Sequence, residues 1–158
     1  MTAIDMEADA FLADSAEAVN GKLYAMGIGW NTIWAQGFPV THPRLALGIT
    51  IHVPFTATNA PHRFTLHLED PDGTRLILAR TPMPDGSVNE LYEVGGEFNV
   101  GRPPLLPAGD EQVVSFAITL DQIVFPEPQL LHWVVTVDGE ELKKLTMRVA
   151  PLQNGVIA

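Results

Sequence analysis

Apolar and polar side chains alternate along most of this 158-residue chain. The most regular alternation runs from Arg44 to Val53, where leucine, isoleucine or valine occupies every second position. A period of two residues places alternate side chains on opposite faces of a β-strand. The pattern therefore predicts a strand with one apolar and one more polar face.

Two further stretches combine this alternation with turn residues. In the stretch Arg63–Ala79, apolar residues alternate on both sides of the turn sequence Asp70–Gly73. The stretch Leu131–Val149 does the same around Asp138-Gly139. Aspartate can bond its own backbone ahead and glycine tolerates positive φ, so both sequences favour tight turns. We expect a β-hairpin in each stretch.

The N-terminal part is less regular. Ala8–Ala13 is rich in alanine and predicts one helical turn or a loop. Asn20-Gly21 is a strong turn signal. Lys22–Ala35 then predicts a strand, and because apolar residues occupy both of its faces, we expect it to be covered on both sides.

Together these segments predict an all-β fold. The pattern favours one antiparallel β-sandwich, immunoglobulin-like, with seven or eight strands in a single domain over residues 1–158. Strands that alternate with helices would instead indicate a parallel sheet, and that pattern does not occur in the sequence.

Charge and composition narrow the possible partners. The net charge is −10, from nine basic and nineteen acidic residues, which disfavours binding to nucleic acid or to an anionic membrane. The chain has no cysteine, which excludes disulfides and thiolate metal sites. We read no secretory signal and no membrane span, so we expect a soluble cytoplasmic protein.

Two segments resemble a known protein family. The first is Ala10–Asp14 leading into Asn20–Tyr24 and Gly27–Trp30, and the second is Phe98–Pro104. Together they are similar to a family of small uncharacterised bacterial proteins, common in actinobacteria, that carries a domain-of-unknown-function label. The resemblance covers most of the chain and implies a β-sandwich, with no activity, ligand or catalytic residue attached.

No catalytic or cofactor motif emerges from the sequence. Gly27-Ile28-Gly29 lacks the third glycine of a dinucleotide-binding loop, because position 32 is Thr32. None of the three serines lies in a G-x-S-x-G motif, and there is no phosphate-binding loop. We expect no cofactor, and a non-enzymatic role is the favoured interpretation.

Metal binding is an alternative that the sequence leaves open. Acidic residues gather at the two turns near Asp70 and Asp138, and calcium sites use such oxygens, but tight turns need the same residues for backbone reasons. The chain also has five histidines without ligand spacing on one element. We expect neither calcium nor zinc to bind. The histidines are His42, His52, His62, His67 and His132.

The chain has more apolar side chains than one core face per strand requires. We interpret the surplus as a contact surface, because tryptophan and rigid proline-framed loops suit protein interfaces. The predicted function is a non-catalytic protein-binding or self-assembly module, possible as a homo-oligomer; the alternative is a loop-built hydrolase or a metal-binding β-sandwich. The candidate interface residues are Trp30, Ile33, Trp34, Phe38, Leu105, Leu106, Leu130 and Val134.

Overall fold

The regular alternation between Arg44 and Val53 lies in one of the two longest strands of the described chain. In the computed structural model, which describes residues 5–152, this segment is the buried part of a strand that extends from Val40 to Val53. All five of its alternating apolar side chains, from Leu45 to Val53, are fully buried. The predicted strand is confirmed.

The described part of the chain is all-β, as predicted, but it has twelve strands and not seven or eight. The additional strands are short ones near the N-terminus and in the middle of the chain, where local sequence signals are weak. One 3₁₀ turn, η1, is the remaining regular element. The elements are β1 (Glu7–Ala13), β2 (Ser15–Val19), β3 (Lys22–Met26), β4 (Thr32–Ala35), β5 (Val40–Val53), η1 (Phe55–Ala57), β6 (Pro61–Glu69), β7 (Ala79–Pro82), β8 (Val88–Leu91), β9 (Glu93–Asn99), β10 (Gln112–Phe125), β11 (Gln129–Val137) and β12 (Glu140–Pro151).

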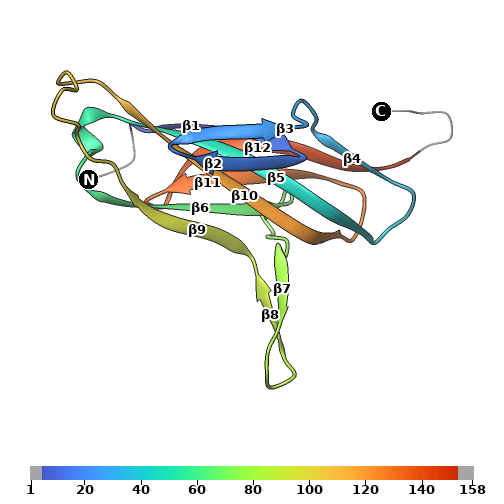
Figure 1. Cartoon of the computed structure of the whole chain (residues 1–158). Coiled ribbons are helices and arrows are strands. Elements are labelled where there is room, and N and C mark those ends of the chain that lie inside the picture. Colours follow the sequence, from blue (N-terminus) through green and yellow to red (C-terminus); the bar gives the residue numbers. More distant parts are fainter. Residues whose placement is uncertain (1–4, 153–158) are drawn as a thin grey trace.

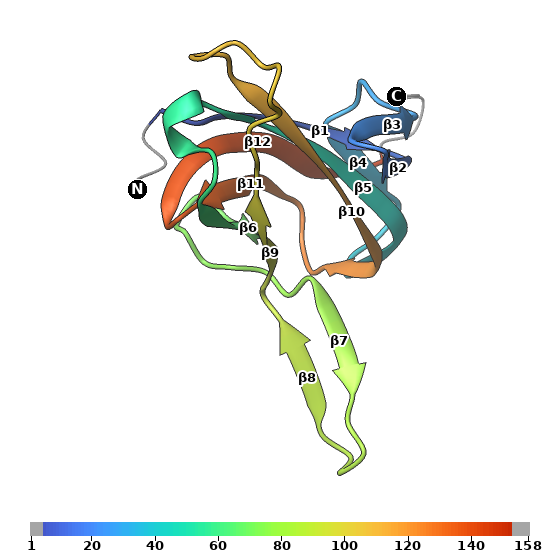
Figure 2. The ribbon, with the colours of Figure 1, turned by 60° about the vertical axis from the view of Figure 1, so that its left-hand side comes forward.

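The strands form two larger sheets and two separate hairpins (Figure 1). One sheet has the order β1-β5-β10, and the other has the order β4-β12-β11-β6-β9. The pairs β2–β3 and β7–β8 are two-stranded, and β7–β8 projects away from the body in both views (Figure 2). Pairing is antiparallel except between β4 and β12, which run parallel and depart from a purely antiparallel fold.

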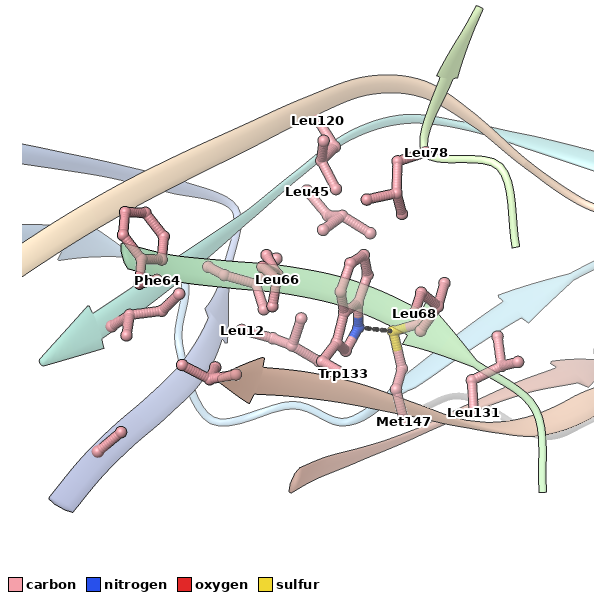
Figure 3. Close-up of a cluster of buried hydrophobic side chains, with 14 of the residues drawn as sticks. Leu12, Leu45, Phe64, Leu66, Leu68, Leu78, Leu120, Leu131, Trp133 and Met147 are labelled. Atoms are coloured by element: carbon pink, nitrogen blue, oxygen red, sulfur yellow. Dashed lines mark hydrogen bonds between the residues drawn. The ribbon is translucent and has the colours of Figure 1, made fainter. Parts of the chain in front are cut away.

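A single cluster of buried side chains joins the two larger sheets. It takes residues from β1 and β5 of the first sheet and from β6, β11 and β12 of the second. Trp133 on β11 lies at its centre with none of its surface exposed, and its indole N–H donates to Met147 Sδ over 3.5 Å (Figure 3). The alternation of apolar residues therefore fills one shared core.

The predicted hairpin over Arg63–Ala79 forms only in part. Its turn is as expected: Asp70 Oδ1 accepts from the backbone N–H groups of Asp72 and Thr74, each over 2.9 Å. Beyond the turn, a single bridge pairs Glu69 with Arg75, and the chain then leaves the sheet. The neighbours of β6 along its length are β11 and β9, which are distant in the sequence.

Ala8–Ala13 is a strand, so the prediction of a helical turn or loop is wrong. It lies in β1 and pairs antiparallel with β5, from Glu7 opposite His52 to Ala13 opposite Ala46. Phe11 lies opposite Gly48, where a β-carbon would come within 2.3 Å of its ring. Pairing with a strand more than thirty residues away overrides the local helical preference of alanine.

Lys22–Ala35 is not one doubly covered strand either. It forms β3 and β4, which belong to different sheets and are separated by Gly27 and Gly29 at φ +73° and +98°. The β2–β3 hairpin lies at the surface, and no residue of it is fully buried. The apolar residues that suggested a central position are therefore partly exposed to solvent.

Candidate functional site

Exposed apolar residues occur on β3, on β4 and on the segment that joins these two strands. The exposed fractions are 56% for Tyr24, 74% for Met26, 59% for Ile28 and 39% for Trp34. Leu152 adds to them, since its N–H donates to Ala35 O of β4 over 2.7 Å and its side chain is also exposed. We call these five residues the β3–β4 apolar strip.

One glycine and two hydrogen bonds shape the middle of this strip. The N–H of Asp14 donates to Met26 O over 3.0 Å, which ties the end of β3 to the end of β1. A β-carbon on Gly27 would come within 2.2 Å of the Asp14 carboxylate, so only glycine fits there. The indole N–H of Trp30 donates to Gly27 O over 2.7 Å and fixes that ring beside the turn.

A cleft of about 270 Å³ opens at this position. We call it the aromatic cleft, and it is defined by its six lining residues. Two of them are tryptophans, two are titratable, and three, including one of the tryptophans, belong to the edge strand β4. The lining residues are Asp14, Trp30, Thr32, Ile33, Trp34 and His42. The first follows β1 and the last lies near the start of β5, so three distant segments build the cleft.

The electrostatics of the aromatic cleft rest on Asp14 and His42. Burial lowers the pKa of His42 below its ordinary value, although a backbone hydrogen bond at Arg44 and the Asp14 charge oppose this. His42 is therefore neutral at pH 7. The exposed Asp14 carboxylate gives the cleft its negative charge. The site combines aromatic surface with a single anion.

Three of the eight candidate interface residues meet in the aromatic cleft, namely Trp30, Ile33 and Trp34. The side chain of Ile33 itself is buried in the core. Phe38 is half-buried and packs against the core beyond β4. These residues lie close together because they come from one short stretch of the chain.

The other candidates lie elsewhere. Leu105 and Leu106 lie in the loop between β9 and β10, away from β4 in both ribbon views, and Leu105 is 96% exposed. Leu130 lies on β11 opposite Arg148 of β12 and is half-buried. Val134 is 2% exposed, between its cross-strand neighbours on β6 and β12, so it offers almost no contact surface.

Sequence reasoning missed seven residues of the strip and the cleft, which are Asp14, Tyr24, Met26, Ile28, Thr32, His42 and Leu152. Asp14 and His42 reach the cleft only through the pairing of β1 with β5 and the return of β3. No short-range pattern carries that information. The exposure of Tyr24 and Met26 is not evident from the sequence, because apolar residues on both faces of β3 are the pattern of a central, doubly covered strand.

The remaining histidines make local contacts. His62 is buried, with Asp138 Oδ2 and Ala57 O each 2.7 Å from one ring nitrogen. The ring therefore links the β11–β12 turn to the backbone of η1. His67 bonds Glu69, and His52 lies 2.9 Å from Glu111, whose hydrogen bond raises the pKa of His52. Within residues 5–152, no three His, Asp or Glu side chains gather as a metal site would require.

The acidic turns use their carboxylates within the fold. Asp70 caps its own turn, as described above. Asp138 accepts from the His62 ring and, through Oδ1, from the backbone N–H of Arg63 over 3.0 Å. These hydrogen bonds stabilise the two turns, and one of them links Asp138 to the His62 side chain.

Comparison with known proteins places the chain in a family. The model of a family of unknown function, DUF6941, matches residues 8–150. The chain belongs to this family. The match agrees with the uncharacterised family indicated by the sequence, and it attaches no activity to the DUF6941 fold. No curated protein matches the chain.

Solved structures show only distant likeness. An alkylpurine DNA glycosylase, AlkC, from Pseudomonas fluorescens is 10% identical with a TM-score of 0.42, over 92% of this chain and 30% of that one. A β-glucosidase from Listeria innocua is 14% identical with a TM-score of 0.40, over 92% and 16%. A family 123 glycoside hydrolase from Clostridium perfringens is 13% identical with a TM-score of 0.31, over 90% and 26%. The chain thus spans less than a third of each, and at these scores the likeness carries no functional argument.

Among the described residues of this DUF6941 chain, no helix has the length and apolarity needed to cross a membrane.

Proposed function

We propose that this protein is a non-catalytic module for protein binding or self-assembly, and that the β3–β4 apolar strip is its contact surface. The observation that carries the proposal is the exposure of Tyr24, Met26 and Ile28, followed by Trp34, within eleven consecutive residues. Scattered single apolar residues are normal on a protein surface, whereas aromatic residues and methionine are enriched at interfaces.

The net charge of the chain favours association through a specific contact over non-specific aggregation. A net charge of −10 makes copies repel one another, so random aggregation is disfavoured. Association must therefore come from a well-packed patch whose burial outweighs that repulsion. An aromatic surface supplies much of the binding energy in such patches because large rigid rings lose little entropy on contact.

The proposal extends to architecture. The shared core between the two larger sheets supports an immunoglobulin-like β-sandwich, to which the β2–β3 and β7–β8 hairpins are additions. In such a fold one core stabilises the domain, and outlying strands are free to carry contacts. The strip lies on β3, on β4 and just beyond β12, at the margin of the core.

Light scattering of the purified protein at micromolar concentration tests the proposal. We expect a mass that is a multiple of 17.2 kDa. Met26→Asp and Trp34→Asp should each return the monomer, because a buried charge at a packed contact is costly. Their far-UV spectra should remain β-like, since both side chains are exposed.

Val88→Asp is the matched control. Val88 is 54% exposed on the projecting β7–β8 hairpin, so its substitution introduces the same charge on an equally exposed apolar residue outside the strip. This variant should keep the mass of the wild type. A wild type that stays monomeric at high concentration would contradict self-assembly and leave only a different protein as partner. Dissociation by Val88→Asp, with the strip variants still assembled, would move the contact to the hairpin.

A further inference from the structure

The aromatic cleft runs along an open strand edge. Within residues 5–152, β4 is the outermost strand of the five-stranded sheet and pairs on one side only, with β12. Asn31 O accepts from the N–H of Arg148 on β12, and Ala35 O accepts from the N–H of Leu152, just beyond β12. In a parallel ladder alternate residues bond the same neighbour, so the backbone groups of Thr32 and Trp34 face the open edge. Both residues also line the cleft.

An open edge of this kind accepts an added strand. Main-chain hydrogen bonds then supply affinity, and a side-chain pocket beside the edge supplies specificity. The aromatic cleft is such a pocket. Its volume of about 270 Å³ lies below the roughly 300–1,000 Å³ typical of pockets for drug-sized ligands, so it suits one long side chain.

The chemistry of the cleft selects a cation. The N–H of Trp30 is bonded to Gly27 O, so its indole offers ring surface to a ligand and no donor. The ring face of tryptophan attracts cations, and a carboxylate beside it adds a direct charge partner. Asp14 is that carboxylate, and the neutral His42 does not compensate its charge. The negative charge of the whole chain also favours a cation.

We propose that the aromatic cleft binds an arginine side chain of a partner polypeptide that lies extended along the open edge of β4. A guanidinium stacks flat on an indole and is more weakly hydrated than an ammonium, so it is easier to bury than lysine. The N–H groups of the guanidinium point outward in its own plane and can bond the Asp14 carboxylate, while its flat face contacts the indole ring of Trp30 or Trp34. The inference rests on the proposed binding function and names the chemistry of the partner.

Nuclear magnetic resonance of the three tryptophan indole N–H groups tests the proposal directly. The probe is N-acetyl-arginine amide, and N-acetyl-citrulline amide is its uncharged counterpart of the same shape. We expect saturable shifts of the Trp30 and Trp34 signals with the arginine probe. The fully buried Trp133 should not shift and serves as an internal control. Citrulline should bind about tenfold more weakly, because it lacks the charge.

Asp14→Asn gives the decisive variant. It keeps the shape of the side chain that packs against Gly27 and removes only the charge, and an unchanged melting temperature would confirm that the fold is intact. We expect the preference for arginine over citrulline to disappear in this variant. Trp34→Ala, at an exposed position, should weaken both probes.

Four results would overturn the proposal. They are the lack of any saturable shift, equal binding of arginine and citrulline, a preference that survives Asp14→Asn, or tighter binding of a neutral sugar such as glucose at the same signals. The probe is a single amino-acid derivative, so its binding does not depend on self-assembly. A monomeric protein in light scattering would therefore leave this test valid, and failure of the titration would leave assembly through the strip untouched.

Discussion

Two hairpins of this molecule both turn at an Asp-Gly pair but differ in what surrounds them. β11 and β12 meet at Asp138-Gly139, where φ is +52° and +83°. β7 and β8 are joined by a turn that contains Gly86 at φ +86°. Five of the nine residues of β11 are buried, and β11 pairs with strands on both sides. No residue of β7 or β8 is buried, and the two strands pair only with each other.

The difference shows what turn chemistry can and cannot do. Turn residues determine where the chain reverses, and they do so equally well in both hairpins. An isolated two-stranded hairpin is marginally stable in water, whereas a strand inside a sheet gains from the burial of its apolar face. We therefore expect β11–β12 to carry the stability of the fold and β7–β8 to contribute little.

Trp133→Ala should have the largest effect on the free energy of unfolding, and it tests the comparison of the two hairpins most strongly. Removing the indole from the core leaves a cavity, and such substitutions cost about 3–5 kcal/mol in the free energy of unfolding. Val88→Ala on β8 should change that free energy by less than about 0.5 kcal/mol. Urea denaturation measures both. A loss below about 1 kcal/mol for Trp133→Ala would show that this hairpin is not the centre of the core.

Asp138→Asn should have the next largest effect on stability, because it weakens the hydrogen bond between His62 and Asp138, which the β7–β8 turn does not have. Asparagine adopts positive φ as readily as aspartate, so the turn itself is kept. The variant loses the carboxylate charge that lies 2.7 Å from His62 Nδ1. Hydrogen bonds to charged groups contribute about 1.5–3 kcal/mol, and we expect a loss of that order near neutral pH. Asp72→Asn, on an exposed turn, is the matched control.

The same pair predicts the response to acid. Burial would raise the pKa of Asp138, but its hydrogen bonds to His62 and to the Arg63 N–H outweigh burial and hold that pKa below its ordinary value. The unfolded chain therefore binds this proton more readily than the folded one. The stabilisation by Asp138 is complete above about pH 4 and is lost as the pH falls through the folded pKa. The gap between wild type and Asp138→Asn should narrow over that range. A constant gap would contradict the pairing.

The sequence was most informative where burial follows local alternation. The apolar faces of Leu45–Val53 and Leu131–Val137 are visible as a period of two residues, and both are buried as predicted. β1 was missed because its identity as a strand depends on β5, not on its own residues. β3 was misjudged because an apolar residue looks the same in a sequence whether a core or a solvent-exposed surface receives it.

The aromatic cleft shows the same limit. The sequence predicts Trp30 and Trp34 as contact residues because they belong to its apolar surplus. Asp14 and His42 join them only through sheet pairing. The charge that selects a ligand was therefore invisible to local reasoning. Aromatic content can be predicted from the chain, whereas the assembly of a binding site requires its topology.

Hydrogen exchange at two protein concentrations tests the central claim, that the margin around β3 and β4 carries association while the core carries stability. In dilute solution, amides of β11 should exchange slowly and those of β7–β8 quickly, in line with their burial. At a concentration at which light scattering shows assembly, we predict additional protection over residues 22–35. The amides of β7–β8 should remain fast. Protection that appears on β7–β8 instead, or uniformly over the chain, would contradict the account.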